Sequence, residues 1–279
     1  MELHTIDTGF FKLDGGAMFG VVPKSIWQKT NPADQNNLCT WATRLLLIQD
    51  QNQLILVDTG LGDKQEESFF KHYHRFDTRS LEEALRQKGI GLSEITDVLL
   101  THLHFDHVGG AVSKNGDRLS PTFPNAKYWT NKTHWDWAMN PNPREKASFL
   151  KENLLPLEES GQLYFVDPAK PSEFNPNIQL RVVNGHTEAM MLPQLAYKGK
   201  TLLYMADLLP SVGHIPLPYV MGYDIRPLQT MVEKSNFWQE AIEGDYVLFL
   251  EHDSTHACCT LQPTERGPRL KDVFSLEEL

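Results

Sequence analysis

Short apolar runs alternate along the chain with polar segments, and most of these runs have the length of a β-strand. Asp50-Gln51-Asn52 interrupts the apolar stretch 43–57 and predicts a hairpin, and Lys198-Gly199-Lys200 predicts a second turn. The predicted strands are the two within 43–57 and those at 96–101, 194–197, 201–206 and 246–250. The chain is therefore expected to be rich in β-sheet.

Helical patterns separate several of these strands. Ser80, followed by Glu83, has the sequence of a capping box, and Gly89 is placed to end the helix that begins there. Pro227 suits the first turn of a further helix, and residues 144–154 also have helical spacing. Strands that alternate with helices predict an α/β fold in which helices cover the outer faces of two sheets.

The chain has 279 residues, which is normal for a single α/β sandwich, so we expect one domain over residues 1–279. The region 112–175 is the least regular part, and three tryptophans lie near His134 in it. Two interpretations are open for this region. It is either a lid inserted over the site, with aromatic side chains that shape a pocket, or an aromatic cluster in the core.

The densest group of polar side chains follows the apolar run Val98-Leu99-Leu100. His102, His104, Asp106 and His107 lie within six positions there. Imidazole combined with carboxylate suits Zn²⁺ or iron. In extended backbone, His102 and His104 point to the same side about 6–7 Å apart and can share one ion. The next two side chains follow a turn and can point elsewhere, so a second ion about 3.5–4 Å from the first is the economical interpretation.

Further candidate ligands follow other strand-like runs of the chain. They are Asp58, His186, Asp207 and His252. Ligands that come from several strand ends at one edge of a sheet form a rigid, convergent site. His134 and His256 are expected to be core or surface residues and not ligands.

This series of residues resembles the metallo-β-lactamase superfamily. The element His102-x-His104-x-Asp106-His107 carries most of the resemblance, which extends from about residue 40 to residue 255. The segments 14–24 and 214–224 resemble a subgroup that includes N-acyl-homoserine lactonases and methyl-parathion-hydrolase-like enzymes. The resemblance implies a four-layer αββα sandwich of metallo-β-lactamase type.

The resemblance also implies two divalent metal ions, with zinc as the expected metal. The implied ligands are His102, His104 and His186 for the first ion, Asp106, His107 and His252 for the second, and Asp207 as a bridge between both. Asp58 is then no ligand, and it holds the ligand loop by hydrogen bonds. A histidine at position 104, where a glutamate could stand, resembles the hydrolytic branch more than the flavodiiron oxygen-reducing branch.

The function implied is a dinuclear metal-dependent hydrolase that uses a metal-bridging hydroxide on a small ester-like substrate, with a lactone as the leading substrate class. Asp106 is the expected catalytic residue that passes a proton to the leaving group. A phosphotriester or a β-lactam is the alternative substrate. A mononuclear iron oxidoreductase, or a binding protein with a vestigial site, is the alternative of another class.

Two stretches depart from the patterns of relatives. Some lactonases carry a tyrosine three residues after the bridging aspartate, where this chain has Pro210. Tyr223 or His214 could donate a hydrogen bond to the substrate in its place, or both could be ordinary loop residues. Residues 187–190 lack the second glycine-histidine pair of glyoxalase II-like enzymes.

The composition narrows the partners to a small-molecule substrate. A net charge of −10 speaks against nucleic acid, which normally needs a basic surface. No run approaches the roughly 18 apolar residues of a membrane span, and the first residues lack the features of a signal peptide. Cys39 and the adjacent pair Cys258-Cys259 predict no disulfide framework, so a cytoplasmic location is expected. A homodimer is left open.

Overall fold

In the computed structural model, which describes residues 1–279, the chain forms two six-stranded sheets and one two-stranded sheet. Its internal contacts divide it into two compact units. The first unit comprises Met1–Gly9 and Thr43–Phe174, and the second comprises Phe10–Ala42 and Asn175–Leu279. The long strands β1 and β2 begin in one unit and end in the other. Each unit is therefore described by itself.

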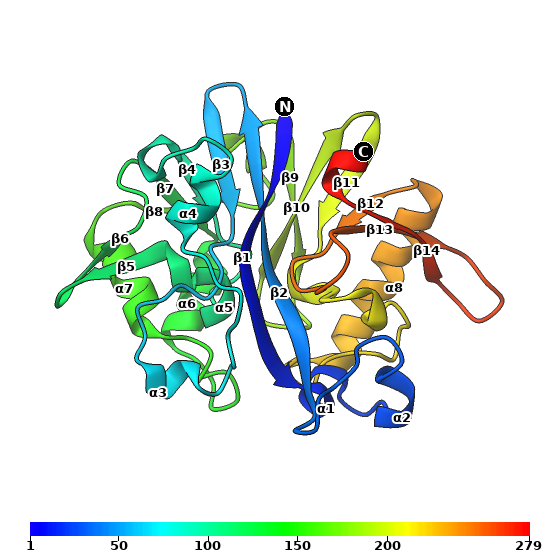
Figure 1. Ribbon diagram of the computed structural model, residues 1–279. Coiled ribbons are helices and arrows are strands. Elements are labelled where there is room, and N and C mark those ends of the chain that lie inside the picture. The colour runs from blue at the N-terminus through cyan, green and yellow to red at the C-terminus, as the bar shows by residue number, and fades with distance from the viewer. The chain divides into compact units, whose positions relative to one another are not determined.

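The sheet of the first unit has the strand order β1-β2-β3-β4-β7-β8 (Figure 1). The predicted hairpin is confirmed, because β2 and β3 pair antiparallel up to Asp50 and Gln53. β3, β4, β7 and β8 pair parallel, so the residues that follow β3 and β4 lie at one edge of the sheet. The bounds are β1 Glu2–Asp14, β2 Leu38–Asp50, β3 Gln53–Val57, β4 Asp97–Leu99, β7 Lys127–Thr130 and β8 Leu163–Phe165.

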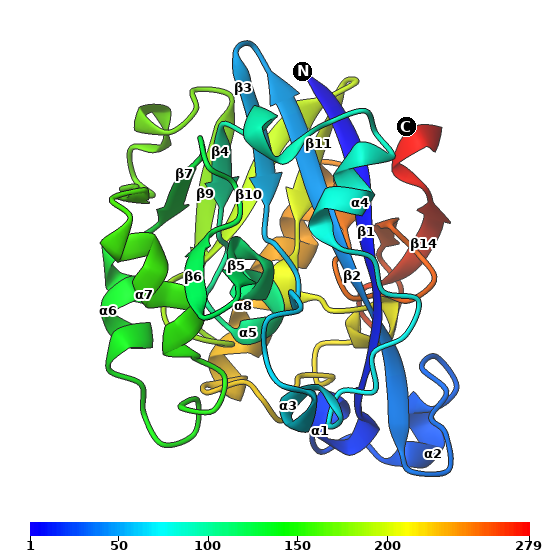
Figure 2. The same cartoon turned by 60° about the vertical axis from the view of Figure 1, so that its left-hand side comes forward.

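Five short helices and a hairpin complete the first unit. Helix α4 begins at the predicted capping box, in which the Ser80 hydroxyl accepts from the Glu83 amide at 3.2 Å. Helix α7 packs on the β5–β6 hairpin (Figure 2). The bounds are α3 Glu67–Phe70, α4 Leu81–Arg86, α5 Phe105–Val108, β5 Val112–Asn115, β6 Arg118–Pro121, α6 Lys132–Met139 and α7 Lys151–Glu159, with 3₁₀ turns at Leu92–Glu94, Gly109–Ala111 and Pro171–Glu173.

The helix predicted at 144–154 is wrong in its position. Helix α7 begins only at Lys151, and the residues before it form turns. The Asn142 side chain explains the difference, because its oxygen accepts from the Arg144 amide at 2.9 Å and from the Glu145 amide at 3.2 Å. Such a side-chain turn competes with helix formation.

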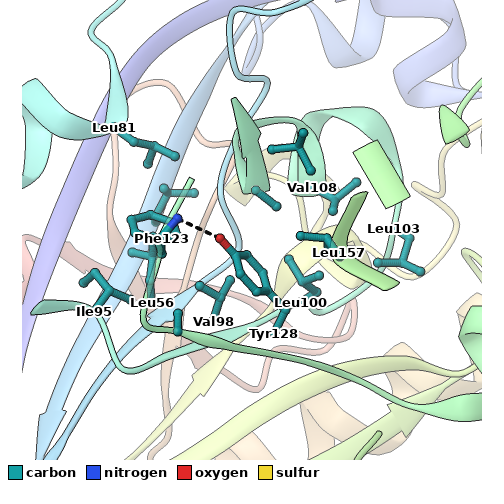
Figure 3. Close-up of a cluster of buried hydrophobic side chains, with 14 of the residues drawn as sticks. Leu56, Leu81, Ile95, Val98, Leu100, Leu103, Val108, Phe123, Tyr128 and Leu157 are labelled. Atoms are coloured by element: carbon teal, nitrogen blue, oxygen red, sulfur yellow. Dashed lines mark hydrogen bonds between the residues drawn. The ribbon is translucent and has the colours of Figure 1, made fainter. Parts of the chain in front are cut away.

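The core of the first unit holds the strands and the ligand loop together. Leu56 on β3 packs among the same buried side chains as Leu103 and Val108, which flank the candidate ligands (Figure 3). The Tyr128 hydroxyl accepts a hydrogen bond from the Phe123 amide at 2.9 Å, and burial raises the pKa of this phenol. Each fully buried aliphatic side chain stabilises the fold by roughly 1.5–3 kcal/mol, so the loop is anchored by its apolar members.

The sheet of the second unit has the strand order β14-β13-β12-β11-β10-β9, and only β11 and β12 pair parallel. The predicted turn is confirmed, with Lys198 and Gly199 at φ angles of 47° and 79° between β10 and β11. The bounds are α1 Gly15–Phe19, α2 Lys24–Trp27, β9 Ile178–Val183, β10 Met190–Tyr197, β11 Lys200–Tyr204, α8 Pro227–Glu243, β12 Val247–Phe249, β13 Cys258–Gln262 and β14 Arg269–Phe274, with 3₁₀ turns at Ala206–Leu208, Val212–His214 and Leu276–Glu278.

Helix α8 of the second unit begins at Pro227, as predicted, and buries Phe237 and Trp238 on the side that contacts β13. Glu233 on the same helix accepts from the Asn184 amide at 2.7 Å and from the Gly185 amide at 3.0 Å. The helix therefore holds the turn that precedes His186.

No helix of the protein combines the length and the apolar character that a membrane crossing requires.

Candidate metal centre

The dense polar cluster occupies the loop after β4 and the short helix α5. His102 and His104 precede the helix, and Asp106 and His107 lie on it. His102 and His107 are fully buried, and His104 and Asp106 are only 7% and 8% exposed. Because buried polar side chains require partners, the atoms that they face indicate what they can bind.

The two histidine rings of the loop converge. His102 Nε2 lies 3.1 Å from His104 Nδ1. His102 Nδ1 lies 3.1 Å from the Thr101 hydroxyl, and His104 Nε2 lies 3.4 Å from a carboxylate oxygen of Glu145. Each ring therefore turns one nitrogen toward the other ring and the second nitrogen toward the protein. Two imidazole nitrogens that face each other in this way are suited to one shared cation.

Asp58, which follows β3 directly, holds this loop in place. Its carboxylate accepts from the Thr101 amide at 2.8 Å and from the Thr101 hydroxyl at 2.7 Å, and it lies 3.1 Å from His107 Nδ1. Asp58 is fully buried and adopts a φ of 59°. The parallel pairing of Val57 with Leu99 explains how it reaches the loop, because both residues end their strands at the same level.

Asp106 and His107 form the second pair of candidate ligands in the first unit. Asp58 faces Nδ1 of His107, and the other nitrogen, Nε2, lies 3.9 Å from an Asp106 oxygen. The glycine pair after the helix allows a close backbone approach. A Cβ on Gly109 would lie 2.0 Å from the Leu61 carbonyl oxygen, so only glycine fits there.

A buried lysine also supports the end of this loop. The Lys64 ammonium donates to the Gly109 carbonyl, and burial lowers the pKa of Lys64 to about 8. The hydrogen bond fixes the backbone just beyond His107, so the ligand loop is held at both of its ends.

In the second unit, one carboxylate lies between two histidines. Asp207 Oδ2 is 3.0 Å from His186 Nε2, and Asp207 Oδ1 is 3.2 Å from His252 Nε2. All three side chains are buried. A carboxylate that presents a different oxygen to each of two ligands has the arrangement of a bridge between two cations.

The remaining nitrogens of these two histidines are fixed by hydrogen bonds. His252 Nδ1 donates to the Ala42 carbonyl at 2.8 Å, and His186 Nδ1 lies 2.9 Å from an Asp224 oxygen. Burial opposes a charge on His186, but the two neighbouring carboxylates outweigh it and raise the pKa of His186 to about 10. The site therefore favours a positive charge at this position, from a proton or from a metal ion.

The two substrate-contacting candidates differ in accessibility. His214 is 1% exposed, its Nε2 donates to the Met18 carbonyl at 2.9 Å, and its Nδ1 lies 2.9 Å from the Ser211 hydroxyl. Its ring also stacks on Phe19, so both nitrogens already serve the interior of the unit. Tyr223 is 40% exposed and can be reached from solvent.

Three residues that support the candidate ligands were not identified from the sequence. Asp224 and Glu145 hold the outer nitrogens of His186 and His104. His134 is buried, and its Nε2 accepts from the Leu103 amide at 2.9 Å, so it positions the loop and is a core residue as expected. No fixed spacing in the sequence links such partners to their ligands.

The donor chemistry fits divalent metal ions of the zinc type. The candidate ligands are imidazole nitrogens and carboxylate oxygens, without thiolate, and the three cysteines are buried and form no disulfide. The outer nitrogens of His107, His186 and His252 are held by a carboxylate or a carbonyl. Such partners are typical of histidines that bind metal ions.

Comparisons with known proteins agree with this geometry. A probable metal-dependent hydrolase from Staphylococcus aureus has the same fold, with a TM-score of 0.87 and 26% identity over 100% of this chain and 98% of that chain. A dizinc quorum-quenching lactonase superposes with a TM-score of 0.81 and 21% identity, over 98% and 95% of the two chains. The predicted α/β fold of metallo-β-lactamase type is thereby confirmed.

A sequence relative covers a smaller part of the chain. A probable metallo-hydrolase from Mycobacterium tuberculosis is 36% identical over 74 residues, which span 24% of this chain and 24% of that protein. The family match is much longer, since it covers residues 42–236 and contains all the candidate ligands except His252. The chain belongs to the metallo-β-lactamase superfamily.

Proposed function

We propose that the protein is a metal-dependent hydrolase in which two divalent ions, with zinc as the expected metal, act on a small ester-like substrate such as a lactone. His102, His104 and His186 are the proposed ligands of one ion. Asp106, His107 and His252 are those of the other, and Asp207 is the proposed bridge.

The observation that carries this proposal is the position of Asp207 between His186 and His252. One carboxylate faces two imidazoles through separate oxygens, at 3.0 and 3.2 Å. A mononuclear iron site does not need that arrangement. The pair of ligand groups in the first unit, His102 with His104 and Asp106 with His107, gives further support, because each pair suits one ion.

When bound, two divalent ions supply a nucleophilic hydroxide near neutral pH and polarise the carbonyl oxygen of the substrate. The residues of the chain then have separate tasks. The Asp106 carboxylate takes up the proton released when the hydroxide forms from water, and it passes this proton to the leaving alkoxide after the ring C–O bond breaks. Tyr223, which is 40% exposed, is the candidate donor to the substrate carbonyl.

The likeness to lactonases favours a lactone among the possible substrates. The dizinc quorum-quenching lactonase was solved with the product N-hexanoyl-homoserine, and other lactonase structures share the fold at TM-scores of 0.65 to 0.67. A hydrolase in the β-lactamase superfamily superposes with a TM-score of 0.78. Phosphotriesters and β-lactams, the alternative substrates, are included in the same hydrolysis screen.

Metal analysis of the purified protein, combined with a hydrolysis screen, tests the proposal. We expect two ions per chain, turnover of acyl-homoserine lactones, loss of activity on chelation and its return with Zn²⁺. Phosphotriesters and β-lactams are the comparison substrates. A single iron per chain without hydrolysis would contradict the proposal and favour the oxidoreductase.

A further inference from the structure

The turn segment 140–148, between α6 and α7, brings a buried carboxylate to one of the candidate ligands. Glu145 is 3% exposed, and its Oε1 lies 3.4 Å from His104 Nε2. The other ring nitrogen of His104, Nδ1, faces His102. We propose that Glu145 is a positioning residue that sets the tautomer of His104, so that Nδ1 carries no proton and can bind a metal ion. The inference rests on the proposed metal site.

The donors around Glu145 determine which atom carries the proton. Its second oxygen, Oε2, accepts from Trp137 Nε1 at 2.8 Å and from Asn142 Nδ2 at 2.6 Å. An indole N–H can only donate, and the Asn142 oxygen is already occupied by the Arg144 and Glu145 amides. When the carboxylate is ionised it can only accept, and the His104 nitrogen that faces Oε1 is then the donor.

The consequence for metal binding follows from the imidazole ring. With the proton on Nε2, the lone pair of His104 Nδ1 is directed toward His102 and away from Glu145. The carboxylate also makes the ring a more basic ligand. Outer partners of this kind typically change metal affinity by about 10–100-fold. Asp58 and Asp224 have the same relation to His107 and His186, and Glu145 extends it to a third ligand.

Glu145 differs from Asp58 and Asp224 in the part of the chain that supplies it. It comes from the region 112–175, for which the sequence left a lid and an aromatic core as alternatives. Trp137, one of the tryptophans of that region, holds the carboxylate through its indole N–H. The region therefore acts on the site through the orientation of one ligand, independently of whether it covers the substrate.

A glutamine at position 145 cannot replace the carboxylate. If its oxygen accepts from Trp137 and Asn142, its NH₂ group faces His104 Nε2. That nitrogen must then accept, and the proton moves to Nδ1, the proposed ligand atom. If the amide group is rotated by half a turn, its NH₂ group faces the Trp137 and Asn142 donors and cannot accept from them. The first orientation satisfies more hydrogen bonds, so Glu145→Gln is expected to select the tautomer that cannot bind the ion.

The Zn²⁺ dissociation constant of the metal-stripped full-length chain, measured by competition with a chromophoric chelator, tests this. Glu145→Gln is expected to weaken Zn²⁺ binding by about 10–100-fold. Glu159→Gln removes the same charge from the exposed side of α7 and is expected to bind as the wild type does. Equal affinity in Glu145→Gln and the wild type would overturn the inference and leave the proposed function intact.

A compensating variant separates the tautomer from packing. In Asn142→Asp/Glu145→Gln, the new carboxylate accepts from the glutamine NH₂, which turns the glutamine oxygen back toward His104. The double variant has the net charge of the wild type and is expected to regain part of the lost Zn²⁺ affinity, because only the Trp137 donor lacks a good partner. A double variant that binds no better than Glu145→Gln contradicts the mechanism.

Nitrogen-15 NMR of the histidine side chains tests the inference without any substitution. In the metal-free wild type, His104 is expected to be protonated at Nε2, and a proton on Nδ1 would overturn the inference. This measurement also separates the two proposals. A wild type that binds no Zn²⁺ contradicts the proposed function, and the tautomer of His104 still decides the role of Glu145.

Discussion

The two units contribute candidate ligands in opposite ways. In the first unit, four of them lie within six residues, at the edge where parallel strands end. In the second unit, the three candidate ligands come from three separate segments of the chain. The first group is ordered mainly by its own backbone, and the second mainly by hydrogen bonds between residues distant in sequence.

This difference has a physical consequence. The loop of the first unit is anchored by apolar neighbours such as Leu103 and Val108, by Asp58 and by the close approach of Gly109 to Leu61. These contacts persist when a single ligand is replaced. In the second unit, Asp207 itself is the central element, since both His186 and His252 face it. Substitutions at the centre of the second group should therefore have the larger effect on metal binding.

Asp207→Asn is expected to have the largest effect. An amide can present only one oxygen, so one of the two histidines would face an NH₂ group. We expect both ions to be lost and hydrolysis to fall by more than the about 10²–10³-fold that follows removal of one electrostatic group. Metal analysis and steady-state kinetics measure this, with Asp272→Asn on the exposed strand β14 as control. A variant that retains two ions per chain would show that Asp207 is no bridge.

Asp106→Asn tests the corresponding carboxylate of the first unit. We expect kcat to fall by about 10²–10⁴-fold, because the amide cannot carry the proton to the leaving group. The ion held by His102 and His104 is expected to remain, since the nitrogens of these two rings face each other. Kinetics on an activated lactone, whose leaving group needs no proton, should show a smaller loss. An equal loss on both substrates would argue against proton transfer by Asp106.

Substitution of the carboxylates that hold the outer nitrogens of His107 and His186 compares the metal affinity and the stability of the two units. Asp58→Asn and Asp224→Asn should each weaken Zn²⁺ binding by about 10–100-fold. Asp58 also accepts two hydrogen bonds from Thr101. Its substitution should therefore lower the free energy of unfolding of the metal-free protein by about 1–3 kcal/mol more. Urea unfolding measures this, and equal stabilities of the two variants would remove the distinction between the units.

The parts of the fold that were predictable are those with a local cause. The hairpin at Asp50 and the capping box at Ser80 depend on neighbouring residues alone, and both are confirmed. The helix predicted at 144–154 failed because periodicity does not show that the Asn142 side chain binds the following amides. Strand β14 is largely exposed at the edge of its sheet, so its apolar pattern was too weak to predict it.

A local cause also decides which residues of the candidate site could be recognised from the sequence. His102 to His107 could be recognised because strand and turn place them together, whereas the partners Asp224 and Glu145 are brought to their histidines by tertiary structure. His214 was a candidate donor to the substrate because sequence does not reveal that Met18 and Ser211 contact both nitrogens of its ring. The lid at 112–175 and the homodimer stay predictions.

The smallest expected effect concerns His214, and it tests whether the second unit has an acid-sensitive interior. Burial lowers the pKa of His214 from the ordinary 6.5 to about 3, with the Met18 carbonyl and Lys234 as smaller influences. Between these values the unfolded chain binds one more proton than the folded protein, so the free energy of unfolding falls as the pH falls.

His214→Gln removes this titration. The loss of stability between pH 7 and pH 5 should then be smaller by about 2 kcal/mol in urea unfolding of the metal-stripped protein. His72→Gln, which replaces an exposed histidine, is the control variant. An unaltered slope in His214→Gln would mean that this ring is already protonated in the folded state and that its hydrogen bonds to Met18 and Ser211 do not hold it neutral.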